Sequence, residues 1–84
     1  MNAKHKKTLA AIFTSPIPRS LAYRDVDSLL RALECKKTEG KGSGVAYGRD
    51  GKSVTFHRPH PGNEMKQYQI KEIRGFLEDI GVKL

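Results

Sequence analysis

The sequence predicts an α+β domain in which two helices cover the same face of a small antiparallel sheet. Three observations support this fold class. Asp50-Gly51 is a two-residue turn signal between two runs of alternating apolar and polar residues, which predicts a β-hairpin. Residues 23–34 and 68–80, on either side of the hairpin, carry apolar residues at helical spacing. Because each helix has one apolar stripe and the hairpin has one apolar face, packing both helices on that face buries all three.

The N-terminal residues 1–14 predict a short amphipathic helix with a basic start. Its apolar residues at helical spacing are Leu9, Ile12 and Phe13. Pro16 and Pro18 end the helix, because proline has no backbone N–H and disfavours helical geometry in the residue before it. We expect residues 1–21 to form a basic helical arm with a proline-containing linker, and residues 22–84 to form the folded domain.

The segment 23–34 predicts the first main helix. Its apolar stripe consists of Tyr23, Val26, Leu29, Leu30 and Leu33. Its polar side consists of Arg24, Asp25, Asp27, Ser28 and Arg31, which we expect to face away from the core. The acidic residues near the start of this segment suit the positive end of the helix dipole.

The short segment 35–38 is either an edge strand or irregular, and it leads into a glycine-rich loop over residues 39–44. The loop lacks the spacing and the Lys-Ser/Thr ending of a phosphate-binding P-loop. Its glycines instead allow a sharp turn or the close approach of a phosphate. Cys35 is the only cysteine, which excludes an intramolecular disulfide and a cysteine pair for a metal, and we expect it to be buried.

The hairpin has a defined register once the turn is placed at Asp50-Gly51. Its core face consists of Val45, Tyr47, Val54 and Phe56. Its other face is small, polar and open, and consists of Gly44, Ala46, Gly48, Ser53, Thr55 and His57. The register places Gly44 directly opposite His57. We expect the chemistry of the protein at this end of the open face, near residues 40–44 and 57–61.

The last part of the chain predicts a loop and then a helix over residues 68–80. The apolar stripe of this helix consists of Ile70, Ile73, Phe76, Leu77 and Ile80. Gly81 is suited to the position that ends the helix, and Val82 to the accompanying apolar contact. The order of the main elements is α-β-β-β-α with both helices on one face, which is the arrangement of the double-stranded-RNA-binding domain.

The charge of the chain indicates an anionic partner. The formal net charge is +7 over 84 residues, with a pI near 9.8. Basic residues concentrate in or beside the hairpin, namely Lys36, Lys37, Lys41, Arg49, Lys52 and Arg58. Such a distribution favours nucleic acid over a merely solvated surface. Because the sequence shows no membrane span and no secretory signal, we expect a cytoplasmic protein.

Four segments together resemble one protein family. They are RDVDSLLRAL, GKGSG, HRPHP and IKEIRGFLEDIGV, in this order and spacing, within residues 22–84. This combination is similar to the HicA toxins of bacterial HicAB toxin–antitoxin modules. The resemblance implies a double-stranded-RNA-binding-like fold and metal-independent cleavage of mRNA without a cofactor. It also implies a hetero-oligomer with a HicB-like antitoxin that masks the active site.

The resemblance also indicates the site. The catalytic histidine of the family follows a Gly-Ser or Gly-Thr pair, which is Gly42-Ser43 here, but the next residue is Gly44, either naturally or as an inactivating substitution. We therefore hypothesise that His57, opposite Gly44, supplies the general base, with His60 as second candidate. The predicted RNA-binding residues are Lys37, Lys41, Ser43, Arg49, Lys52 and Arg58, of which Lys41 and Arg58 would hold the scissile phosphate.

Two other interpretations remain open. The protein is either a non-catalytic RNA-binding module that keeps the fold and charge of the family, or a protein whose only role is to dock the antitoxin. In both cases His57 is a polar residue at a strand end and His60 shapes the turn between two prolines.

Overall fold

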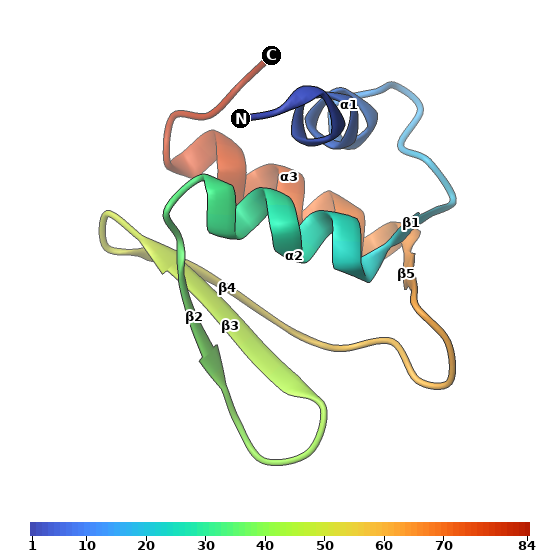
Figure 1. Ribbon diagram of the computed structural model, residues 1–84, viewed down its shortest axis with the longest axis vertical. Helices are drawn as coiled ribbons and strands as arrows, with labels where there is room; N and C mark the ends of the chain where they lie inside the picture. The colour runs from blue at the N-terminus through green and yellow to red at the C-terminus, as the bar shows by residue number, and fades with distance from the viewer.

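The computed structural model describes residues 1–84 and has the predicted α+β architecture (Figure 1). The elements in chain order are α1 (Ala3–Ile12), β1 (Ser20–Ala22), α2 (Tyr23–Ala32), β2 (Lys36–Glu39), β3 (Gly44–Arg49), β4 (Lys52–His57), β5 (Glu64–Lys66) and α3 (Gln67–Asp79). Helices α2 and α3 pack on one face of the sheet formed by β2, β3 and β4, and α1 lies on the far side of these two helices. The opposite face of the sheet carries no covering element.

The three-stranded sheet has the order β2-β3-β4 and is antiparallel throughout. The predicted hairpin register is confirmed, because Gly44 pairs with His57 and each following pair up to the turn is as expected. Asp50 and Gly51 have φ angles of 54° and 79°, as a type I′ turn requires. The predicted core face is buried, and the rings of Tyr47 and Phe56 stack with centroids 5.8 Å apart.

The segment 35–38, which was either a strand or irregular from the sequence, provides the edge strand β2. A second sheet was not predicted. It consists of β1 and β5, which pair antiparallel through Leu21 and Met65. Each strand has only three residues, so neither shows the alternation that identifies a strand in a sequence. This small sheet fixes the start of α2 beside the start of α3.

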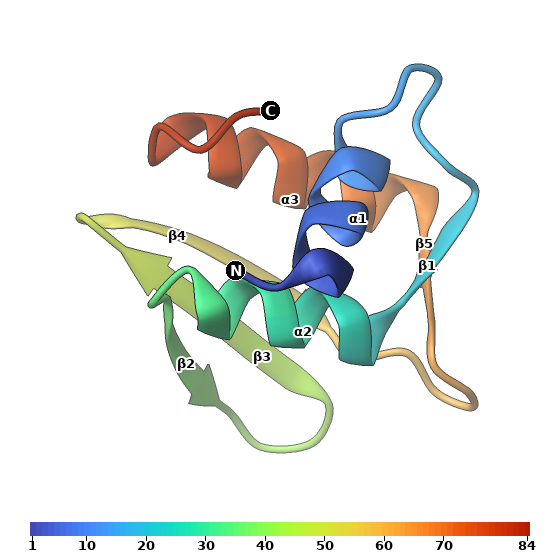
Figure 2. The same ribbon diagram turned by 45° about the horizontal axis from the view of Figure 1, so that its top comes forward.

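Helix α1 is integrated into the core. Leu9 and Ile12 are buried in the same apolar cluster as α2 and α3, and Figure 2 shows α1 lying across both helices. Arg74 of α3 donates hydrogen bonds to the backbone oxygens of Ile12, at 2.8 Å, and Thr14. A cation at this place satisfies carbonyl groups that the helix itself leaves unpaired. The arm is therefore packed against the domain.

Both main helices end in a residue with positive φ. Gly81 follows α3 as predicted, and the backbone N–H of Val82 donates to the carbonyl of Leu77 at 2.8 Å, which is the Schellman arrangement. Glu34 has the same role after α2, with φ of 64°, and Cys35 donates to Leu30 at 3.1 Å. These turns direct the chain from each helix into the next segment. Cys35 is buried as expected.

None of the three helices combines the length and the apolar character that crossing a bilayer requires.

Candidate nucleic-acid interface

The open end of the β3–β4 hairpin holds a serine and a histidine in contact. Ser43 Oγ lies 3.0 Å from His57 Nδ1, and the backbone N–H of Arg58 donates to the Ser43 carbonyl at 2.8 Å. The second hydrogen bond extends the ladder one step beyond the Gly44–His57 pair. The side chain of His57 is exposed, and its Nε2 has no hydrogen-bond partner within the chain. The imidazole is thus oriented by Ser43 through one nitrogen and accessible through the other.

His60 lies near this pair, in the loop after β4. It lines a shallow pocket of about 330 Å³ together with Ser43, Arg58 and the ring of Tyr23. It also lines a neighbouring pocket of about 210 Å³ together with His57 and Arg58. The peptide bond between His60 and Pro61 is cis. Both candidate histidines therefore border the same hollow at the end of the sheet.

Arg58 connects the two loops that form this hollow. One guanidinium nitrogen donates to the carbonyl oxygen of Gly42 at 2.7 Å, and another lies 3.2 Å from the Glu39 carboxylate. Gly42 has φ of 70°, a conformation that glycine adopts without steric cost, and this places its carbonyl within reach of Arg58. Arg58 thereby holds the glycine-rich loop beside His57 and His60, and it lines both pockets.

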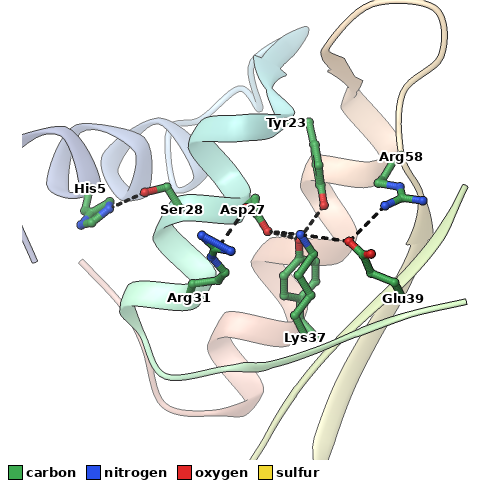
Figure 3. Close-up of polar contacts among 9 residues, drawn as sticks. His5, Tyr23, Asp27, Ser28, Arg31, Lys37, Glu39 and Arg58 are labelled. Carbon is green, nitrogen blue, oxygen red and sulfur yellow. Dashed lines mark hydrogen bonds and ion pairs between the residues drawn. The ribbon is translucent and has the colours of Figure 1, made fainter.

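A chain of polar contacts leads from Arg58 to the interior (Figure 3). Glu39 lies 3.5 Å from Lys37 Nζ, which lies 2.9 Å from Asp27. Tyr47 donates a hydrogen bond to the same carboxylate, and the Tyr23 hydroxyl lies 2.7 Å from that of Tyr47. Because Tyr47 donates to Asp27, its oxygen accepts from Tyr23. Through Asp27 and Lys37, the network connects α2 to the edge strand β2.

The pKa values of this network follow from burial and pairing. Burial acts to raise the pKa of the Asp27 carboxyl, but hydrogen bonds from Tyr47 and Lys37 and the nearby cations lower it below its ordinary value. The hydrogen bond to Asp27 raises the pKa of the Lys37 ammonium. Burial and the bond to Asp27 raise the pKa of Tyr47 far above its ordinary range. The pair is therefore ionised and the tyrosine neutral across the physiological range.

One expectation from the sequence is corrected here. Asp27 was assigned to the polar side of its helix, away from the core, but its side chain is only 17% exposed and points at Lys37 and Tyr47. The helical pattern could not show this, because both partners come from strands that are distant in sequence. The polar partners of a half-buried carboxylate depend on tertiary packing and not on spacing along the helix.

The remaining predicted RNA-binding residues are spread along the hairpin. Lys41 is exposed in the glycine-rich loop, close to Ser43, and Lys52 is exposed beside the turn. Arg49 donates to the backbone oxygen of Leu33 at 3.2 Å and pairs with Asp50. Lys37 points to the helical side of the sheet, because it pairs in register with the buried Tyr47. The two neighbouring pockets share Arg58 and His60, while Ser43 lines one and His57 the other. Arg49 and Lys52 flank the turn at the other end of the hairpin.

Lys36 belongs to the open face and was absent from the predicted site. It pairs with Gly48 in the β2–β3 ladder, so its side chain shares the face of Gly48 and Ser53. Both residues line a broad concavity over this face. A strand assignment for residues 36–39 would have given this placement by alternation. No group of three or more His, Cys, Asp or Glu side chains is arranged as a metal site anywhere in the chain.

The fold and this geometry agree with the comparison to known families. The family model described as "HicA toxin of bacterial toxin-antitoxin" matches residues 23–82. The chain belongs to the HicA family. A HicA protein is the toxin of a toxin–antitoxin module, typically a ribonuclease, and its partner is an antitoxin. The match extends from the first residue of α2 to just beyond the end of α3. No curated protein and no solved structure matches the chain significantly.

Gly44 occupies the position at which the resemblance in sequence implies a histidine. A Cβ atom at position 44 would have no other atom within 4 Å. The φ angle of Gly44 lies outside the left-handed region that favours glycine. The backbone therefore has room for a side chain at Gly44. The residue paired with Gly44 across the ladder is His57.

Proposed function

We propose that this HicA protein is a metal-independent endoribonuclease that cleaves mRNA, with His57 as general base. The observation that carries the proposal is the position of His57. It lies opposite Gly44, its Nδ1 contacts Ser43, its Nε2 is accessible, and Arg58 follows it directly. Histidine is the side chain best suited to accept and release a proton near neutral pH.

The proposed reaction needs only groups of the chain and of the RNA. His57 Nε2 accepts the proton of the ribose 2′-hydroxyl, and O2′ forms a bond to the adjacent phosphorus. The bond from phosphorus to O5′ breaks, and O5′ takes a proton from His60. The products are a 2′,3′-cyclic phosphate and a 5′-hydroxyl. Arg58 and Lys41 stabilise the charge that develops on the phosphate oxygens.

The rest of the RNA would follow the basic hairpin. Arg49 and Lys52 supply phosphate contacts beyond the hollow, Ser43 holds the imidazole, and Lys37 acts through Glu39 on the position of Arg58. A HicB-like antitoxin would mask this surface in a hetero-oligomer, and the reaction would take place in the cytoplasm, where mRNA is available. Because the contacts are largely ionic, affinity for RNA should fall steeply with added salt.

The test is cleavage of a long unstructured RNA by the purified protein in EDTA, with His57→Ala in parallel. We expect the unmodified protein to release fragments with cyclic phosphate ends and the variant to be slower by about 100-fold or more. A substrate with 2′-deoxyribose throughout should bind and stay intact, since it lacks the attacking hydroxyl. Cleavage of that DNA, or cleavage that requires added Mg²⁺, would contradict the proposal.

A second candidate function follows from Gly44. A HicA protein without the family histidine could retain RNA binding or antitoxin docking and have no catalytic activity. In the first case RNA binds with a strong salt dependence and is not cut by any variant. In the second case RNA affinity is negligible at physiological salt, and only the antitoxin binds. The EDTA assay, paired with a binding titration, separates all three functions.

A further inference from the structure

The first turn of α3 carries an aromatic side chain that the core does not use. Tyr68 is 60% exposed, and the other strongly exposed large apolar residues, Met1 and Leu84, are the two chain ends. The other two tyrosines are packed. Tyr47 is buried, and the hydroxyl of Tyr23 lies 2.7 Å from the hydroxyl of Tyr47. An exposed aromatic residue within a helix, with no packing role, is a candidate for a contact with a partner.

Tyr68 lines the same small pocket as both candidate histidines. This pocket has a volume of about 210 Å³, and its walls include His57, Arg58, His60 and Lys66 together with Tyr68. Arg58, which would hold the phosphate, lines this pocket and the neighbouring one. A base in this pocket would therefore belong to a nucleotide beside the scissile bond.

A buried glutamine fixes this arrangement. Gln69, which is only 6% exposed, donates from Nε2 to the backbone oxygen of His57 at 3.0 Å. Its Oε1 accepts from the backbone N–H of Lys66 at 3.0 Å. The end of β4 and the first turn of α3 are therefore held together by one side chain. The backbone of Tyr68, which precedes Gln69, is thereby held near the backbone of His57.

We propose that Tyr68 is the stacking platform for one nucleobase of the bound RNA, beside the phosphate held by Arg58. The inference rests on the proposed RNA-binding function. Proteins that bind single-stranded RNA place unstacked bases on exposed aromatic rings, next to cations that hold the backbone. Glu64 also lines this pocket, and a carboxylate there opposes a phosphate but accepts hydrogen bonds from a base amino group. The pocket thus suits a base, and the adjoining Arg58 suits its phosphate.

The chain contains no tryptophan, so the fluorescence of a single introduced tryptophan reports on its own surroundings. Tyr68→Trp introduces one fluorophore at the proposed platform, and Leu84→Trp introduces one at the exposed C-terminus, which lies away from the hollow. Both variants are titrated with a 2′-O-methyl RNA oligonucleotide, which cannot be cleaved through its 2′ oxygen. We expect saturable quenching of the indole fluorescence in Tyr68→Trp and little change in Leu84→Trp. An oligonucleotide with abasic sites should leave the fluorescence of Tyr68→Trp unquenched.

Affinity measurements complete the test. Tyr68→Ala should weaken binding of the same oligonucleotide by about 10-fold or more, and Tyr68→Phe should keep the affinity, since stacking uses the ring and not the hydroxyl. If RNA binds with unchanged affinity to Tyr68→Ala and does not quench the fluorescence of Tyr68→Trp, the platform is refuted while RNA binding stands. If the unmodified chain does not bind RNA, the proposed function and the platform both fail.

Discussion

Gly44 and His57 face each other across the β3–β4 ladder, and the space above Gly44 is empty. Side chains at directly opposed positions of an antiparallel pair have Cβ atoms about 4.5–5.5 Å apart. An imidazole on either strand can therefore reach nearly the same volume. The proposed function requires that His57 on β4 supplies the imidazole that β3 lacks at Gly44.

A histidine at position 44 should increase activity. Gly44→His adds a second imidazole next to His57, on a Cβ that has open space, and we expect the initial rate of RNA cleavage in EDTA to rise by about 10-fold or more. Gly44→Ala is the matched control, because it adds the Cβ without the ring. A rate for Gly44→His no higher than that of Gly44→Ala would show that this position does not face the reacting atoms.

Ser43 should act through His57. Ser43→Ala removes the contact to Nδ1, so the imidazole loses its fixed orientation, and we expect cleavage to slow by about 10-fold. The same substitution made in a His57→Ala background should have almost no further effect, since the two residues act as one unit. Ser53→Ala, on the same open face but without a contact to His57, is the control. Additive losses in the double variant would indicate separate roles.

Glu39 should weaken RNA binding by competing for Arg58. Glu39→Gln removes a negative charge 3.2 Å from the guanidinium, and we expect the dissociation constant for RNA to fall roughly two- to fivefold at low salt. Glu78→Gln makes the same charge change on the exposed face of α3 and should have a smaller effect. Fluorescence anisotropy with a labelled oligonucleotide measures both. Equal effects for the two variants would reduce the role of Glu39 to its contribution to net charge.

The Asp27 carboxylate should make the fold sensitive to acid. Its pKa in the folded chain lies below the ordinary value of 3.8, so its stabilising contribution is present above that value and is lost as the pH falls through the folded pKa. At neutral pH we expect Asp27→Asn to lower the free energy of unfolding by about 1–3 kcal/mol, because Lys37 loses its nearer and more buried charged partner. Urea unfolding at pH 7 and near pH 2 measures this, and the difference between the two proteins should shrink in acid. A difference that is independent of pH would contradict the ionised pairing.

The sequence supports some parts of this structure better than others. Asp50-Gly51 and strict alternation determine the hairpin register, because a shift by one residue would expose Tyr47 and Phe56. The pairing of β1 with β5 and the contact between Arg74 and the end of α1 are not visible in the sequence. They join segments more than 40 residues apart and involve strands of three residues or single backbone oxygens.

In the candidate site, too, the sequence predicts some features and not others. The Gly44–His57 pair and the place of Arg58 beside it follow from the register of two adjacent strands. The partners of Lys37 were not predictable, because they depend on how α2 rests on β2, and neither element contains a local signal for that contact. For Tyr68, the sequence predicts only that it begins a helix. Its exposure became evident once the buried stripe of α3 was known.

The most direct test of the account moves the histidine across the ladder. RNA cleavage in EDTA is measured for the unmodified chain, for His57→Ala, and for His57→Ala combined with Gly44→His. We predict that His57→Ala is slower by about 100-fold or more and that the double variant recovers much of the lost rate, because the imidazole returns to the same volume from the opposite strand. Undiminished cleavage by His57→Ala would contradict the claim that this histidine replaces the missing one.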